Sequence, residues 1–203
     1  IEYAIPEFRI SRDMIKKDLE LVKAQGIEFK LGFNEKLDIN KLKKDYDYIV
    51  IAIGAGQPGQ ISLEEGGEKT LNAITFLESF NKKKENLDLG KNVCVIGGGN
   101  VAMDAARAAK RVPGVESVSI VYRRTRQFMP ADYEEIKVAL EEGILIKELL
   151  APLSYKDGRL ICEEMMLGER DKTGRRKPLS TGRKTVLEAD AVIVAVGEKV
   201  DSG

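Results

Sequence analysis

The chain has 203 residues, of which 33 are lysine or arginine, 33 are aspartate or glutamate and 43% are hydrophobic. This is the composition of an ordinary soluble protein of one to one and a half domains, and the balanced charge gives no basis for a nucleic-acid partner. No apolar stretch approaches the roughly 18 residues of a membrane span and no signal-peptide pattern opens the chain, so we expect a cytoplasmic protein with no membrane partner.

The first part of the chain predicts helices that alternate with strands. Ser11 suits the N-cap of a helix that runs to about Gln25, and Gly26 ends that helix. Apolar alternation over residues 27–33 predicts a short strand, and a short helix follows. The continuous apolar run over residues 45–54 is typical of a buried parallel strand.

A glycine cluster follows this run. Gly54, Gly56 and Gly59 have the GxGxxG spacing of a dinucleotide-binding turn. Residues 60–69 show no helical apolar period, however, so no helix N-terminus is predicted there to receive a phosphate. We interpret these glycines as a tight turn that passes close to a cofactor bound elsewhere.

The most specific pattern of the chain follows a predicted helix over residues 72–80 and a lysine-rich connector. An apolar strand over residues 92–96 runs into Gly97, Gly98 and Gly99, and a helix is predicted over residues 100–111. Gly97, Gly99 and Ala102 have the GxGxxA spacing that seats a dinucleotide diphosphate on a helix N-terminus. Gly97 allows the sharp turn, Gly99 removes a Cβ near the phosphates and Ala102 allows close packing.

The end of the next strand indicates which dinucleotide binds. An acidic residue at this place holds the ribose 2′-hydroxyl of NAD, whereas cations there accommodate the 2′-phosphate of NADP. The strand over residues 116–122 is followed by Arg123, Arg124 and Arg126, and residues 117–127 contain no aspartate or glutamate. The pattern predicts NADPH. The alternative is that these arginines are solvated surface residues.

The remaining elements complete an α/β pattern. Pro130 lies near the start and Gly143 at the end of a predicted helix, and a third strand follows it. Residues 151–189 predict antiparallel hairpins, with turns at Asp157-Gly158, DKTG and STG. A last buried strand, AVIVAV, ends at Gly197.

Histidine and cysteine content limits the chemistry of the chain itself. The sequence has no histidine, which excludes a Ser-His-Asp or Cys-His triad and removes the usual metal ligand. Cys94 and Cys162 lack the CxxC spacing of a redox pair, and their sequence contexts favour packing. We therefore expect no catalytic side chain, no metal site, and chemistry that comes from a cofactor.

On these residues the chain resembles the flavoprotein subunits related to the glutamate synthase small chain, and most closely the selenate reductase flavoprotein subunits. The segments that carry the resemblance are IPEFRIS, YDYIVIAIGAG, VIGGGNVAMDAARAAKRVPG, YRRTRQFMPADYEE, LICEEMMLGERDKTGRR and ADAVIVAVGEKVD. The resemblance implies two nested nucleotide domains. We expect a partial FAD-binding domain with a connector over residues 1–90, a Rossmann-like NAD(P)H-binding domain with a parallel sheet and an antiparallel excursion over residues 91–196, and the return to the FAD domain over residues 197–203.

The resemblance also implies hydride transfer from NADPH to FAD, with electrons passing to iron-sulfur clusters and a terminal acceptor on a missing upstream segment or a partner subunit. The positions that it assigns are Gly97, Gly99, Asn100 and Val101 at the diphosphate and nicotinamide end, Arg123, Arg124 and Arg126 at the adenosine phosphate, and Pro6, Gly54 and Gly56 toward the flavin. Gly197, which ends a strand that joins the two domains, is a further cofactor-binding position. Because such proteins carry their first FAD fingerprint ahead of the segment seen here, we expect a fragment that binds nucleotide but does not turn over alone.

Two other functions stay open at this point. A thioredoxin-reductase-like disulfide reductase would share the nested domains, but the missing CxxC motif argues against it. A nucleotide-sensing or interaction module would use the same NADPH site without transferring electrons.

Overall fold

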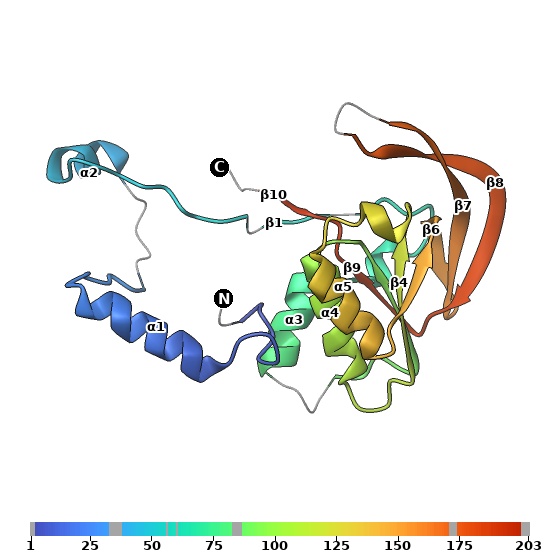
Figure 1. The fold of residues 1–203 in the computed structure, drawn as a ribbon, viewed down its shortest axis with the longest axis horizontal. Coiled ribbons are helices and arrows are strands. Elements are labelled where there is room, and N and C mark those ends of the chain that lie inside the picture. The colour runs from blue at the N-terminus through green and yellow to red at the C-terminus, as the bar shows by residue number, and fades with distance from the viewer. Residues whose placement is uncertain are drawn as a thin grey trace.

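The computed structural model describes residues 3–32, 38–55, 57–59, 61–82, 87–170 and 174–199, and its elements are shown in Figure 1. The helices are α1 (Arg12–Ala24), α2 (Ile39–Asp45), α3 (Ala73–Lys82), α4 (Asn100–Lys110) and α5 (Tyr133–Glu141), with the 3-10 turns η1 (Gly67–Lys69) and η2 (Arg126–Phe128). The strands are β1 (Gln57–Pro58), β2 (Leu71–Asn72), β3 (Asn92–Ile96), β4 (Ser117–Tyr122), β5 (Leu145–Glu148), β6 (Leu150–Lys156), β7 (Arg159–Arg170), β8 (Arg176–Glu188), β9 (Ala191–Val194) and β10 (Glu198–Lys199).

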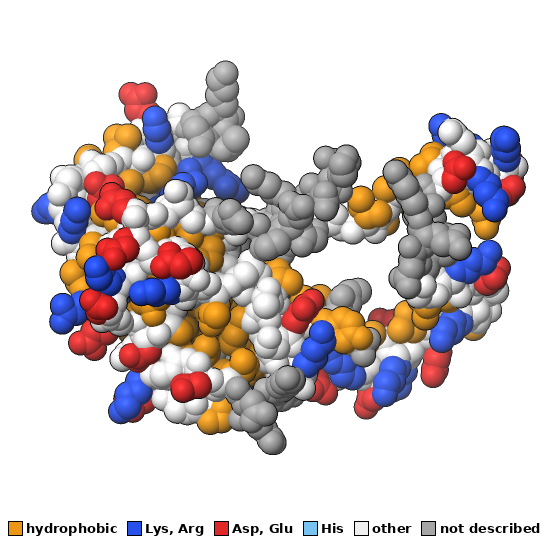
Figure 2. All heavy atoms as spheres, turned by 180° about the vertical axis from the view of Figure 1, so that it is seen from behind, with side chains coloured by type: hydrophobic (Ala, Val, Ile, Leu, Met, Phe, Trp, Pro, Cys, Tyr) orange, Lys and Arg blue, Asp and Glu red, His pale blue; other side chains and the backbone are white. Residues whose placement is uncertain are grey.

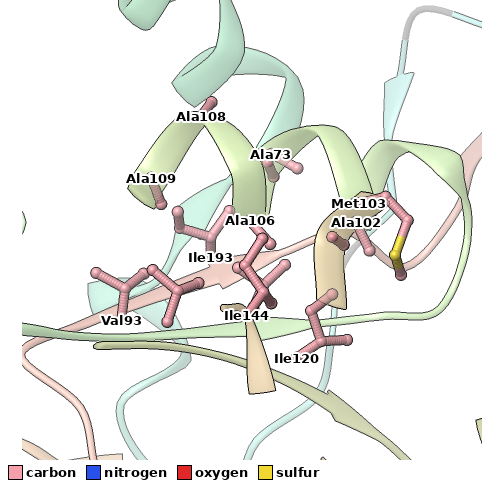
Figure 3. Packing of buried hydrophobic residues seen from close by; sticks show 14 of the residues in the cluster. Ala73, Val93, Ala102, Met103, Ala106, Ala108, Ala109, Ile120, Ile144 and Ile193 are labelled. Atoms are coloured by element: carbon pink, nitrogen blue, oxygen red, sulfur yellow. The ribbon is translucent and has the colours of Figure 1, made fainter. Parts of the chain in front are cut away.

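A five-stranded parallel sheet in the order β2-β9-β3-β4-β5 forms the centre of the molecule. Val95 of β3 pairs with Ile120 of β4 on one side and Ile193 of β9 on the other. One face of this sheet packs against α3, α4 and α5, and the core between them is shown in Figure 3. Alanines of α4 are fully buried there, because small side chains let the helix lie close to the strands.

A second, three-stranded antiparallel sheet, β6-β7-β8, covers the other face of the parallel sheet. Cys94 and Cys162 lie in this second core with Tyr155, whose hydroxyl donates to the carbonyl of Asp190 at 2.8 Å. Burial on both faces explains why β3 and β9 read as continuous apolar runs. The predicted α/β class, with a parallel sheet and an antiparallel excursion, is confirmed.

The hairpins of this antiparallel sheet follow the prediction in part. Asp157 and Gly158 have φ values of 49° and 70° and form the two-residue turn between β6 and β7. The turn predicted at the STG segment is wrong. This segment is an irregularity within β8, where the pairing with β7 shifts and Gly182 has φ 76°. The DKTG turn lies mostly outside the described residues.

Two predicted strands are wrong. Residues 27–31 form no strand, and residue 33 lies outside the described part of the chain. Residues 46–55 run as an extended segment, with Tyr48 91% and Val50 88% exposed. A strand needs a hydrogen-bonded neighbour, and none lies alongside this segment among the described residues. The apolar sequence alone therefore does not place it in a sheet.

Several helix boundaries differ from the prediction. α5 begins at Tyr133, so Pro130 precedes the helix by three residues, while Gly143 with φ 80° follows its C-cap as expected. Helix α4 ends at Lys110 rather than Arg111. β2 and α3 precede the lysine-rich connector and yet belong to the parallel sheet and its core. The domain division at residue 90 stays a prediction.

The segment before α1 docks on the helical face of the sheet, whereas α1 and α2 extend away from it (Figure 1). Arg9 Nη1 lies 2.7 Å from Asp104 Oδ2 on α4, and Asn81 Nδ2 donates to the carbonyl of Tyr3 at 2.6 Å. Neither α1 nor α2 has a buried residue. Figure 2 shows cationic and anionic side chains interspersed over the visible face. Within the described ranges, every helix is too short or too polar to span a bilayer.

Candidate dinucleotide-binding site

The turn between β3 and α4 requires glycine at its first two positions. Gly97 has φ 148°, its N–H donates to the carbonyl of Val121 at 3.2 Å, and a Cβ there would collide with the carbonyl oxygen of Ala195. A Cβ on Gly98 would lie 2.6 Å from the ring of Tyr122. The backbone thus passes tightly between the ends of β9 and β4.

Gly99 is glycine for a different reason. It is the N-cap of α4 with an ordinary backbone (φ −95°, ψ 178°), and a Cβ there would meet only Pro130 Cγ, at 4.0 Å. No side chain caps this helix start, and the N–H groups of Asn100 and Val101 precede the first intrahelical bonds. The helix therefore presents its positive end and free donors, which favours an anion.

Asn100 ties the start of α4 to the start of α5. Its Nδ2 donates to Asp132 Oδ2 at 2.9 Å, and its Oδ1 accepts from the Asp132 N–H at 2.9 Å. Ala131 N–H also donates to the carbonyl of Gly98 at 3.0 Å. The glycine turn is therefore held from the α5 side as well as from the sheet.

A cavity of about 790 Å³ opens at this turn, at the carboxyl ends of β3, β4 and β9. Ligands of open α/β sheets bind at this edge. The predicted site residues that line the cavity are Gly97, Gly98, Gly99, Asn100, Val101, Arg123, Arg124 and Gly197. The described lining contains three arginines, the third being Arg175, and no carboxylate.

The other predicted site residues lie elsewhere. Ala102, in the first turn of α4, is fully buried and has a packing role. Arg126 is half exposed and its Nε lies 3.5 Å from Glu148 Oε1, away from the cavity lining. Gly54, with φ 71°, also lies off the lining, and Gly56 is outside the described residues. The structure thus brings together the glycine turn and two of the three predicted arginines.

Sequence reasoning missed Arg175 and Asn72. Asn72 lines the cavity and its Oδ1 accepts from the Ile74 and Thr75 N–H groups at 2.9 and 3.1 Å, which caps α3. An N-cap asparagine before an apolar helix is recognisable from sequence, but its position beside Gly97 depends on the pairing of β2 with β9.

The two cysteines take no part in this site. Burial raises the pKa of Cys94 to about 11 and that of Cys162 to about 12, so neither is a thiolate at neutral pH. Both are buried free thiols. No group of metal-ligating side chains occurs among the residues that the structure describes. Disulfide chemistry therefore finds no support in these two side chains.

Known proteins are similar to this chain in sequence or in fold. YgfK of Escherichia coli K12 is 41% identical over 204 residues, which cover all of this chain and 20% of YgfK. The glutamate synthase [NADPH] small chain of Escherichia coli K12 is 32% identical over 217 residues, covering 97% of this chain and 46% of that protein. FprA of Mycobacterium tuberculosis in complex with NADPH superposes with a TM-score of 0.62 at 20% identity, covering 80% of this chain and 52% of FprA.

These comparisons confirm the resemblance to the glutamate synthase small chain, while the link to selenate reductase subunits stays a prediction. The chain spans only a fifth of the length of YgfK. The family model for pyridine nucleotide-disulphide oxidoreductases matches residues 11–202. The chain belongs to the pyridine nucleotide-disulphide oxidoreductase family.

Proposed function

We propose that this chain is the NADPH-binding part of a flavin-dependent oxidoreductase. The observation that carries the proposal is one cavity that combines the uncapped start of α4 with Arg123 and Arg124 and is lined by no carboxylate among the described residues. An uncapped helix start suits a diphosphate, and guanidinium groups suit an additional phosphate. The NADPH complex of FprA, a protein of similar fold, supports the same choice of ligand.

The residues of the cavity fit such a ligand. The N–H groups of Asn100 and Val101 would hold the diphosphate, and the open space at Gly99 leaves room for its oxygens. Arg123 and Arg124, at the end of the adjacent strand, would hold the 2′-phosphate. A volume of about 790 Å³ lies in the range of cofactor sites.

The chain contributes binding and orientation to the reaction. When bound, NADPH supplies a hydride for reduction of a flavin. We infer that this flavin is FAD, that Pro6, Gly54 and Gly56 lie toward it, and that the electrons leave to iron-sulfur clusters and a terminal acceptor outside this chain. A partner subunit or domain belongs to the same proposal, which the relative named as a small chain supports. We also propose a cytoplasmic location.

The test is the nucleotide preference of the chain and of an Arg123→Ala, Arg124→Ala double variant. Each well-aimed guanidinium–phosphate contact contributes roughly 1.5–3 kcal/mol, so wild type should bind NADPH at least about tenfold more tightly than NADH. The double variant should lose this preference and retain NADH binding. Titration calorimetry measures all four affinities. Equal affinities of wild type for the two nucleotides would overturn the NADPH assignment.

A second test addresses electron transfer. A longer protein that includes this chain should reduce an artificial dye with NADPH once flavin is bound, whereas the isolated chain should purify without yellow flavin. A longer protein that binds both cofactors and stays inactive would instead support a nucleotide-sensing module.

A further inference from the structure

A third cationic side chain reaches the cavity from a distant part of the sequence. Arg175 lies beside the first residue of β8, and it lines the cavity together with Arg123 and Arg124. More than fifty positions separate Arg175 from the end of β4, where residues that distinguish NADP from NAD usually lie. A residue next to β8 of the antiparallel sheet therefore lines the cavity at the carboxyl ends of the parallel strands.

The backbone beside Arg175 is held in place by its neighbours. Arg176 Nε donates to the carbonyl of Gly168 at 2.8 Å, and its Nη2 donates to the carbonyl of Leu167 at 3.1 Å. Arg176 also pairs with Arg170 across the two strands. The start of β8 is therefore fixed to β7 by side-chain as well as backbone contacts.

The start of β8 is also connected to Arg124, one of the predicted specificity residues. Arg124 Nε donates to the carbonyl of Arg176 at 2.8 Å, which places the segment after β4 against the start of β8. The bond orients the Arg124 guanidinium and leaves its two Nη groups without a protein acceptor in the described part of the chain. Arg175, the sequence neighbour of Arg176, lines the same cavity as Arg124.

The charge of the cavity indicates what these side chains bind. Three guanidinium groups line this cavity, and its described lining contains no carboxylate, so the wall attracts an anion. A phosphate monoester carries nearly two negative charges and several acceptor oxygens, so it can accept from more than one guanidinium.

We propose that Arg175 is a specificity-determining residue that contacts the 2′-phosphate of NADPH from the β7–β8 hairpin. This inference rests on the proposed NADPH function and adds a residue that the strand-end rule does not include. Arg176 has a positioning role, because its guanidinium donates to two backbone carbonyl groups of β7.

The experiment compares Arg175→Ala with Arg183→Gln, a control on the same strand whose side chain is 75% exposed and pairs with Glu164 at 3.0 Å. Affinities for NADPH, NADH, 2′,5′-ADP and 5′-AMP are measured by titration calorimetry. We expect Arg175→Ala to weaken NADPH and 2′,5′-ADP by about tenfold and to leave NADH and 5′-AMP within about twofold. Arg183→Gln should leave all four affinities unchanged. Arg175→Lys, which keeps the charge but loses the planar fork, should fall between wild type and Arg175→Ala.

The outcomes separate this inference from the proposed function. If wild type prefers NADPH and both Arg175 variants keep that preference, the inference fails and the proposed function stands. If wild type binds NADPH no more tightly than NADH, the NADPH assignment fails and the inference fails too. An equal loss of affinity for all four ligands in Arg175→Ala would show a structural role and would also overturn the inference.

Discussion

At the scale of residues, the three consecutive glycines of the β3–α4 turn meet three different requirements. Gly97 needs a backbone conformation that other residues rarely adopt, and Gly98 lies against the ring of Tyr122. Gly99 has neither constraint, since its backbone is ordinary and its Cβ position is open. Only the third glycine therefore points to a ligand rather than to the fold.

This difference predicts opposite effects for two alanine variants. Gly99→Ala should change the free energy of unfolding by no more than about 1 kcal/mol, because only an N-cap preference is lost. It should still weaken NADPH binding about tenfold or more, because the added methyl group enters the space for the diphosphate. Urea unfolding and titration calorimetry check both expectations.

Gly98→Ala is the matched comparison. Its Cβ would lie 2.6 Å from the Tyr122 ring, so the protein should lose roughly 1–3 kcal/mol of stability through overpacking. A stable Gly98→Ala protein, or a Gly99→Ala protein with wild-type affinity, would contradict this account of the turn.

At the scale of elements, α4 connects the nucleotide site to the N-terminal segment. Its first turn faces the cavity, and one turn further Asp104 is only 5% exposed and pairs with Arg9. The Asp104 Oδ1 atom is buried without a hydrogen-bond partner among the described residues. Burial raises the pKa of Asp104, and the nearby Arg9 opposes that rise. Arg9 is therefore the group that stabilises the buried carboxylate.

Removing Arg9 should be costly at neutral pH. We expect Arg9→Ala to destabilise the protein by about 3 kcal/mol at pH 7, since it leaves a buried carboxylate without its cation. The cost should shrink as the pH falls through the folded-state pKa of Asp104, which burial raises, because the protonated carboxyl no longer needs a cation. Adding Asp104→Asn to Arg9→Ala should restore part of the stability. Urea unfolding of the single and double variants checks this, and additive losses would contradict it.

The contact between α4 and α5 gives a second pH dependence, which comes from a carboxylate whose pKa is lowered. Hydrogen bonds from Arg111 and Arg107 lower the pKa of Glu142 from 4.5 to about 2. A carboxylate with a lowered folded-state pKa stabilises the protein above its unfolded-state pKa and loses that effect as the pH falls through the folded-state value. The contribution at pH 7 is at most about 3 kcal/mol, and partial solvent exposure reduces it.

The variant Glu142→Gln tests this contribution. Its loss of stability relative to wild type should be largest above pH 5 and should shrink between pH 4.5 and about 2. Glu141→Gln is the control, because Glu141 is exposed and its side chain forms no ion pair within the described ranges. A stability difference for Glu142→Gln that does not change with pH would rule out the ionic origin.

At the scale of the whole molecule, the structure consists of a well-packed body and an extended arm. The body holds the five-stranded and the three-stranded sheet and the helices α3, α4 and α5, whereas α1, α2 and residues 46–55 lie outside it (Figure 1). Within residues 46–55 of the arm, four large apolar side chains are more than two-thirds exposed, namely Tyr48, Val50, Ile51 and Ile53. An exposed apolar run of this kind promotes association of chains.

Charged substitutions in the arm should therefore improve solubility without affecting the body. A Val50→Lys, Ile53→Lys variant should show the melting temperature of wild type within about 1–2 °C and should bind less of a hydrophobic dye. Calorimetry and dye fluorescence measure these properties. A clearly lower melting temperature would mean that these side chains are packed in the isolated chain.

The sequence predicted the body far better than the arm, for a physical reason. The strand over residues 92–96, the glycine turn and Arg123 depend on local spacing, which the sequence contains in full. The strand predicted over residues 45–54 depends on neighbouring strands, which an apolar pattern cannot supply. Arg175 was missed because its place depends on the register of two long strands with two irregularities.

The central claim is that the start of α4 holds the diphosphate of NADPH, and a crystal structure of the chain with NADPH tests it most directly. We predict diphosphate oxygens within about 3 Å of the N–H groups of Asn100 or Val101, and the 2′-phosphate against Arg123 and Arg124. A dinucleotide bound away from the Gly97–Gly99 turn, or one whose diphosphate does not reach α4, would contradict the account.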